Sequence, residues 1–184
     1  MRDERAAPTT VFLDRDGTIN RGAPPGDYIK GWSEFEFLPR APEAIARLNA
    51  AGMRVVVVTN QRGIALGRMS ADDVEDIHRR MTDELRAAGA ELAAVYYCPH
   101  EVGECGCRKP DVGMFEKARR DLPRIDFGRS VVIGDSSADM EAADRIGARR
   151  ILIATDEAPA ATEVDERVSS LWEAAAMLDQ PLRR

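Results

Sequence analysis

The chain has 184 residues, of which 44% are hydrophobic and 32% charged, and its formal net charge is −6. This length supports one domain with a buried core, and the acidic balance, without a block of Lys and Arg, argues against DNA or RNA as a partner. The longest purely aliphatic run, Val55–Val58, is too short to cross a bilayer, and the charged N-terminus lacks the apolar region of a secretory signal. We therefore expect one cytoplasmic domain over residues 1–184, with no membrane partner.

The first half of the chain begins with a predicted strand at 10–13. A long connection, 15–40, follows, with a short extended piece at 35–38. Connections of this length are usually functional. Pro42 is suited to a helix start, and Gly52 to its end. The apolar run 54–59 then predicts a strand that is buried on both faces.

Ser70 is a suitable N-cap for the next predicted helix, which ends at Gly89. Further strands are predicted at 92–97, 130–133 and 150–154, and further helices at 112–122, 138–146 and 170–178. Residues 155–168 are polar, and we expect them to form a mobile segment. Strands alternating with helices predict a five-stranded parallel sheet with helices on both faces.

Four of the predicted strands are followed by, or end on, polar side chains: Asp14, Thr59, Cys98 and Asp135. Ligands of such sheets bind beyond the carboxyl ends of the strands. Asp14 and Asp16 are the strongest pair, because two carboxylates after a buried strand are poorly solvated and repel each other. A chain retains such a pair where a cation or a reaction requires it, although Asp-x-Asp alone could also be a turn or a helix cap.

All three cysteines of the chain lie within ten residues, together with a histidine, as Cys98, His100, Cys105 and Cys107. An odd, clustered set does not suit a disulfide framework, whereas three thiolates and one imidazole form a closed tetrahedral set for Zn²⁺. We predict a structural zinc site in a loop, 98–107, inserted after the third strand. The alternative is three ordinary buried thiols. The other histidine, His78, adjoins two arginines and is expected on the surface.

Four motifs occur in an order that resembles the zinc-bearing subgroup of haloacid dehalogenase-like (HAD) phosphatases. They are Asp14-Arg15-Asp16-Gly17-Thr18-Ile19-Asn20, Thr59-Asn60-Gln61-x-Gly63-Ile64, Cys98-Pro99-His100 with Cys105-x-Cys107-Arg108-Lys109-Pro110, and Gly134-Asp135-x₃-Asp139. The resemblance implies a Rossmann-like three-layer α/β sandwich with strand order 3-2-1-4-5. It also implies a small monomer that lacks a large cap domain.

The resemblance also implies roles for individual residues. Asp14 would attack phosphorus to form an aspartyl phosphate, and Asp16 would exchange protons with the leaving oxygen and with water. Thr59 and Lys109 would bind the phosphoryl oxygens. Asp14, the backbone carbonyl of Asp16, and Asp135 would hold Mg²⁺, a hard cation that prefers oxygen ligands. Asp139 could be only a helix cap.

The subgroup includes phosphatases of heptose 1,7-bisphosphate and of histidinol phosphate. Residues 35–39, 96–98 and 113–114 look more like the heptose enzymes. Arg62 and the four-residue gap between His100 and Cys105 depart from that pattern, and the gap is nearer the histidinol-phosphatase length. We expect a small phosphorylated metabolite, a heptose bisphosphate first and histidinol phosphate as the alternative. A DNA 3′-phosphatase and a non-catalytic binding module are weaker hypotheses.

The residues expected to contact the substrate lie in three loops. They are Gly26, Asp27, Tyr28, Asn60, Gln61, Arg62, Arg108 and Lys109. Arg108 and Arg62 are the candidates for a second phosphate, because a planar guanidinium suits that group.

Overall fold

The computed structural model describes residues 8–154 and 163–179. Their strands form one parallel sheet in the order β3-β2-β1-β4-β5-β6. The strands are β1 (Thr10–Leu13), β2 (Arg54–Asn60), β3 (Ala94–Cys98), β4 (Ser130–Gly134), β5 (Arg149–Ile153) and β6 (Glu166–Val168). The α-helices are α1 (Ala41–Ala50), α2 (Ala71–Ala87), α3 (Gly113–Asp121), α4 (Ser137–Arg145) and α5 (Leu171–Leu178). Short 3₁₀ turns cover Trp32–Glu34 and Phe127–Arg129.

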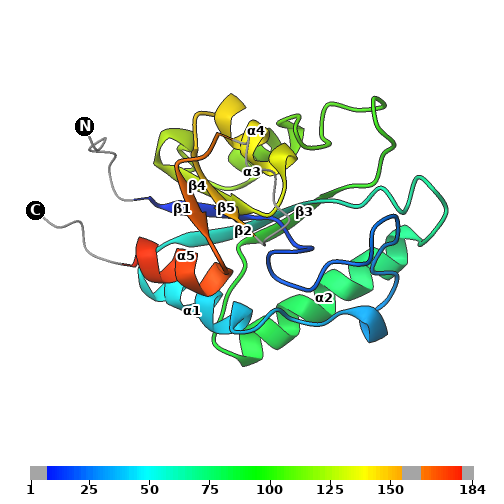
Figure 1. Ribbon diagram of the computed structural model, residues 1–184, viewed down its shortest axis with the longest axis horizontal. Coiled ribbons are helices and arrows are strands. Elements are labelled where there is room, and N and C mark those ends of the chain that lie inside the picture. The colour runs from blue at the N-terminus through cyan, green and yellow to red at the C-terminus, as the bar shows by residue number, and fades with distance from the viewer. Residues whose placement is uncertain (1–7, 155–162, 180–184) are drawn as a thin grey trace, which may run out of the picture.

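The helices cover both faces of the sheet, as predicted (Figure 1). Successive residues of a strand point to opposite faces, and β1 illustrates this. Val11 and Leu13 pack with α1, α2 and α5 on one face. Phe12 packs with α3 and α4 on the other, where its ring lies 5.0 Å from that of Phe115. The central strands are apolar on both faces because both are covered.

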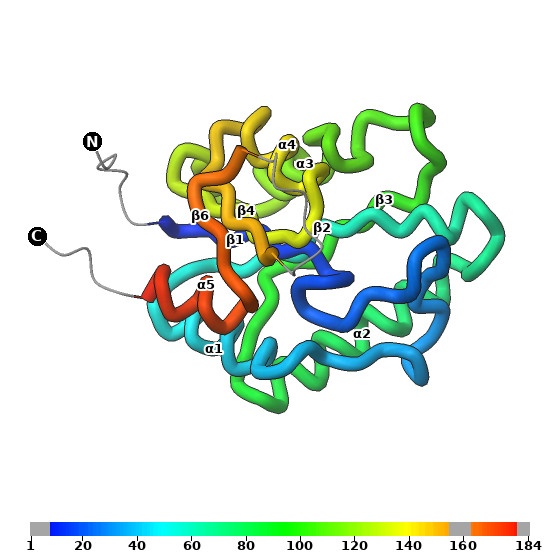
Figure 2. The backbone as a smooth tube through the Cα atoms, viewed as in Figure 1, coloured from blue at the N-terminus to red at the C-terminus, as the bar shows by residue number. Residues whose placement is uncertain are grey.

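The sheet has one strand more than the five predicted. β6 pairs with β5 beside the C-terminal helix (Figure 2), and Arg149 forms an ion pair with Glu166 across the two strands at 2.5 Å. Three residues are too few to show a period of two in the sequence, so no strand was predicted here and these residues were assigned to the polar segment 155–168. Of that segment, 155–162 lies outside the described residues.

The long connection between β1 and α1 packs against the core through the side chains of Trp32, Phe35 and Phe37. Asn20 forms an isolated antiparallel bridge with Phe37, which agrees with the short extended piece expected at 35–38. Phe35 stacks on Trp32 with 4.8 Å between ring centroids. Among the described residues, no helix is both long enough and apolar enough to cross a membrane.

Candidate active site

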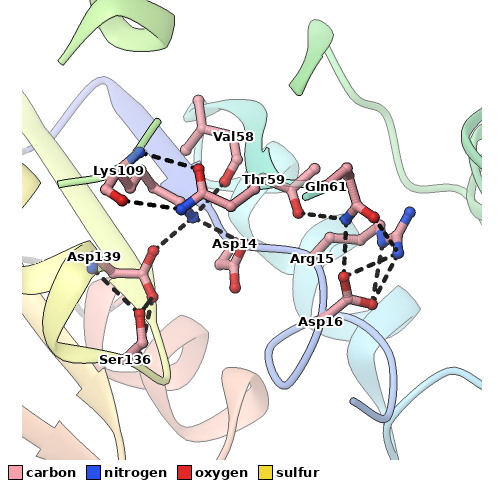
Figure 3. Close-up of polar contacts among 10 residues, drawn as sticks. Asp14, Arg15, Asp16, Val58, Thr59, Gln61, Lys109, Ser136 and Asp139 are labelled. Atoms are coloured by element: carbon pink, nitrogen blue, oxygen red, sulfur yellow. Dashed lines mark hydrogen bonds and ion pairs between the residues drawn. The ribbon is translucent and has the colours of Figure 1, made fainter. Parts of the chain in front are cut away.

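Lys109 joins three elements at the carboxyl edge of the sheet. Its Nζ lies 2.8 Å from Asp14 Oδ1, 2.6 Å from Asp139 Oδ1, and 2.7 Å from the carbonyl oxygen of Val58 in β2 (Figure 3). The Lys109 side chain is 3% exposed and that of Asp139 1% exposed. Because buried charges require partners, this contact fixes the ends of β1, β2 and α4 relative to one another.

Asp14, Asp135 and Asp139 form an acidic cluster, with one carboxylate oxygen from each within 4.8 Å of the others. Two glycines leave the room for it. A Cβ at Gly17 would lie 1.9 Å from Asp135 Oδ2, and a Cβ at Gly134 would lie 2.4 Å from Asp139 Cγ. Gly17 also has a φ of +82°, which disfavours other residues. The donor set therefore suits a hard divalent cation.

Burial and neighbouring charges shift the pKa values of three side chains in and beside the cluster. Burial raises the pKa of Asp14 to about 7, against the attraction of Lys109 and with the repulsion of Asp139. Burial opposes a charge on Lys109, but Asp139 and Asp14 outweigh it and raise its pKa. Asp135 stands at the exposed rim, where partial desolvation and Asp139 raise its pKa to about 6. A cation between Asp14 and Asp135 would relieve this repulsion.

The residues at the carboxyl end of β2, and Gln61 after it, are engaged within the site. Asn60 donates from Nδ2 to the carbonyl oxygen of Lys109 and accepts from its backbone N–H, both at 3.0 Å. Its amide therefore holds the Lys109 segment against β2. Gln61 Nε2 donates to Thr59 Oγ1 and to Asp16 Oδ2, both at 2.9 Å. Thr59 is 1% exposed, with its hydroxyl at the sheet edge where the resemblance places a phosphoryl contact.

The Asp16 side chain lies to one side of the acidic cluster, next to Arg15 and Gln61 (Figure 3). Its carboxylate accepts from Arg15 Nη2 at 2.9 Å and from Asn20 Nδ2 at 2.9 Å. Burial opposes ionisation of Asp16, but Arg15, Asn20 and Gln61 together lower its pKa. Arg15, whose side chain is fully buried, was not among the site residues predicted from the sequence.

His78 is buried, with 7% of its surface exposed, so the surface expected from its arginine neighbours was wrong. Its Nε2 lies 3.1 Å from Arg15 Nη1. The helical spacing of the sequence could have predicted this burial. His78 is four residues after Val74 and three before Met81, which are both fully buried on the same stripe of α2.

Asp139 is more than a helix cap. It forms a capping box with Ser136 at the start of α4, and its other carboxylate oxygen contacts Lys109.

The four predicted zinc ligands converge. Cys107 Sγ lies 3.1 Å from Cys105 Sγ, 3.3 Å from Cys98 Sγ and 3.3 Å from His100 Nδ1, and the four ligand atoms all lie within 4.8 Å of one another. Tetrahedral zinc with bonds of about 2.3 Å to sulfur requires separations of about 3.8 Å, so the set is close to that geometry. The thiols form no disulfide.

The residues predicted to contact the substrate differ in their exposure and in their partners. Tyr28 packs on Gly63, where a Cβ would lie 2.9 Å from the ring. Gly26 and Asp27 are exposed, and Asp27 pairs with Lys30 at 3.0 Å. Arg62 Nε pairs with Glu101 at 2.6 Å. Arg108 Nη1 is buried and has no hydrogen-bond partner among the residues that the structure describes.

Comparisons with known proteins give one consistent result. A family model described as HAD-hydrolase-like matches residues 106–174. The chain is 40% identical over 169 residues to D-glycero-alpha-D-manno-heptose-1,7-bisphosphate 7-phosphatase of Mycobacterium bovis, covering 90% of this chain and 88% of that protein. It is 42% identical over 145 residues to D-glycero-beta-D-manno-heptose-1,7-bisphosphate 7-phosphatase of Rhodopseudomonas palustris, covering 74% and 78%. D,D-heptose 1,7-bisphosphate phosphatase from B. bronchiseptica, solved with magnesium and phosphate, superposes with a TM-score of 0.78 at 32% identity, covering 92% and 97%.

The acidic cluster predicts a pH-dependent stability change in Asp14→Asn. The folded-state pKa of Asp14, about 7, exceeds its ordinary 3.8. The folded protein therefore binds this proton more tightly than the unfolded chain, and Asp14 lowers the free energy of unfolding as pH rises from about 4 to 7. In protein dialysed free of magnesium, Asp14→Asn should unfold at a higher temperature than wild type at pH 8. The difference should shrink toward pH 4.

Asp72→Asn, which removes an exposed carboxylate of α2, is the control for loss of one negative charge. A difference between Asp14→Asn and wild type that stays constant across this pH range would contradict the account of the cluster.

Proposed function

The chain is a phosphatase of the HAD-like family that includes the heptose-1,7-bisphosphate 7-phosphatases, and we propose that it hydrolyses the 7-phosphate of a D-glycero-D-manno-heptose 1,7-bisphosphate. The observation that carries the proposal is the buried Lys109, which touches the carboxylates of both Asp14 and Asp139. This contact supports Asp14 as the nucleophile, because it holds that carboxylate beside a positive charge and within a cluster of metal-ligand type at one sheet edge. Identity to heptose-bisphosphate phosphatases over most of the chain supports the choice of substrate.

In the proposed reaction, Asp14 attacks the phosphorus of the 7-phosphate, and a bond forms between its carboxylate oxygen and phosphorus. The bond between phosphorus and O7 of the sugar breaks, and that oxygen takes a proton from Asp16, which must enter this step protonated although Arg15, Asn20 and Gln61 lower its pKa. Asp16 then takes a proton from the water that attacks the aspartyl phosphate, which releases phosphate and restores Asp14. Lys109 and the Thr59 hydroxyl stabilise the charge on the transferring group.

Asp14, Asp135 and the backbone carbonyl of Asp16 would hold Mg²⁺ in this proposal. When bound, the ion offsets the negative charges that the nucleophile and the phosphoryl group bring together. Asp139 remains with Lys109, its partner at 2.6 Å.

The cysteine cluster would hold a structural Zn²⁺ that fixes the loop before Lys109. Cys107 lies two residues before Lys109, and the loop also rests on α3, where the Gly113 N–H donates to the Gly106 carbonyl at 2.9 Å. A closed set of four ligands leaves no position for substrate. We therefore propose that this zinc site stabilises the fold. That the protein is a monomer and lies in the cytoplasm remain predictions.

The test is phosphate release by purified protein with Mg²⁺, comparing both anomers of heptose 1,7-bisphosphate with histidinol phosphate at equal concentrations. We expect a preference for one heptose anomer and loss of turnover in a folded Asp14→Asn variant. Full activity of that variant would contradict the mechanism, and faster turnover of histidinol phosphate would contradict the substrate.

Arg108 is predicted to contact the second phosphate. Because its Nη1 is a buried donor without a partner in the described chain, an anion there would satisfy it. A hydrogen bond between charged groups contributes about 1.5–3 kcal/mol. Arg108→Ala should therefore lower kcat/KM for the bisphosphate by about 10- to 100-fold, while kcat/KM for heptose 7-phosphate changes by less than about threefold.

Arg62→Ala is the matched variant, because Arg62 is already paired with Glu101. It should have the smaller effect on the bisphosphate. Equal losses for the bisphosphate and the monophosphate in Arg108→Ala would show that Arg108 does not recognise the second phosphate.

Removal of zinc is predicted to destabilise the fold, because metal binding to a closed ligand set stabilises the folded state. Protein treated with a strong chelator and returned to Mg²⁺ should melt at a lower temperature, and added Zn²⁺ should restore it. Cys105→Ser should behave like the chelated protein. Identical unfolding with and without zinc would refute a structural role for the cluster.

A further inference from the structure

Asp16 belongs to a buried polar cluster that begins at the β1 edge and reaches α2. Arg15 Nη2 donates to both oxygens of the Asp16 carboxylate at 2.9 Å, and Arg15 Nε donates to Oδ1 at 3.3 Å. Arg15 has no exposed side-chain surface, whereas Asp16 is 29% exposed. The arginine thus holds Asp16 from the inside, while the Asp16 side chain remains partly exposed.

A buried guanidinium needs acceptors for its other N–H groups, because an unpaired buried donor is costly. His78 Nε2 lies 3.1 Å from Arg15 Nη1, and a guanidinium can only donate. His78 Nε2 must therefore accept, which requires the neutral ring with its proton on Nδ1. Burial and the nearby Arg15 lower the pKa of His78 to about 3, which agrees with a neutral ring.

Several contacts fix the histidine itself. It projects from the middle of α2, a helix that begins with a capping box at Ser70. The rings of His78 and Tyr97 meet edge to face, with 5.5 Å between centroids. His78 is thus placed by α2 and β3, two elements that contribute no carboxylate to the acidic cluster.

We propose that His78 is a positioning residue for proton transfer: its Nε2 orients the Arg15 guanidinium, which in turn holds the Asp16 carboxylate toward the leaving oxygen. The inference rests on the proposed function, since it concerns the residue that protonates that oxygen. Gln61, in the loop after β2, also holds the Asp16 carboxylate: its Nε2 donates to Asp16 Oδ2 at 2.9 Å.

A positioning role and a purely structural role predict different dependence on the leaving group. A sugar alkoxide needs a proton to depart, whereas the weakly basic phenolate of 4-nitrophenyl phosphate departs almost without one. Misplacement of Asp16 should therefore slow hydrolysis of the sugar phosphate far more than that of the aryl phosphate. Loss of folded protein would lower both rates equally.

The experiment compares two amide variants that differ by one methylene. The side-chain oxygen of His78→Gln reaches about the position of Nε2, and that of His78→Asn stops short of it. Met81→Leu, a buried position one turn further along α2, is the control for altered packing. Each variant is assayed at a temperature well below its unfolding midpoint, with heptose bisphosphate and with 4-nitrophenyl phosphate.

We expect His78→Asn to lower kcat/KM for heptose bisphosphate by about tenfold or more, within the roughly 10²–10⁴-fold that general acid–base catalysis contributes. The value for 4-nitrophenyl phosphate should change by less than about threefold. His78→Gln should recover most of the loss, and Met81→Leu should resemble wild type with both substrates.

Equal losses in His78→Gln and His78→Asn on the heptose substrate would overturn the inference, as would equal losses on the two substrates. The wild-type arm keeps this failure distinct from failure of the proposed function. If wild type releases no phosphate from heptose bisphosphate, the proposed function fails first. If wild type is active and the two amide variants are indistinguishable, the inference about His78 alone is wrong.

Discussion

A single buried ammonium group lies among carboxylates that come from different parts of the chain. Lys109 Nζ contacts Asp14 after β1, Asp139 in α4 and the Val58 carbonyl in β2, all within 2.8 Å. Without that positive charge, the acidic cluster would be buried, crowded and mutually repelling. Much of the surrounding architecture serves to place this one side chain. Asn60 holds its backbone on both sides, and the cysteine cluster lies immediately before it in the chain.

The site divides into two parts with different electrostatic character. Around Asp14 and Asp135, burial and like charges raise the carboxylate pKa values, which suits a place where a cation and a phosphoryl group meet. Around Asp16, a buried arginine and amide donors lower the carboxylate pKa despite burial. A cation bound between Asp14 and Asp135 would offset the repulsion that raises these pKa values and keep Asp14 ionised for attack, whereas an ionised Asp16 suits the step in which it takes a proton from water. Gln61 links the two parts through Thr59 and Asp16.

The sequence predicted the parts of this arrangement that depend on strand ends and clustered ligands. Parallel strands with polar residues at their carboxyl ends must bring those residues to one edge of the sheet. The close spacing of the cysteines along the chain likewise indicated that they form a cluster. The sequence did not reveal β6, whose three residues show no periodicity, or the contacts of Arg15. A charged residue between two aspartates resembles a solvated position, and only the path of the backbone after β1 turns it inward. His78 was misjudged because its arginine neighbours were weighed above its place on the apolar stripe of α2.

The central claim is that Asp14 becomes phosphorylated during turnover. The most direct measurement is to stop the reaction with acid in the steady state, reduce with borohydride, and map the chain by peptide mass spectrometry, since reduction converts an aspartyl phosphate to homoserine. The account predicts homoserine at position 14 only, in samples that received heptose bisphosphate and Mg²⁺. Homoserine at position 16, 135 or 139, or active enzyme that yields none at position 14, would contradict it.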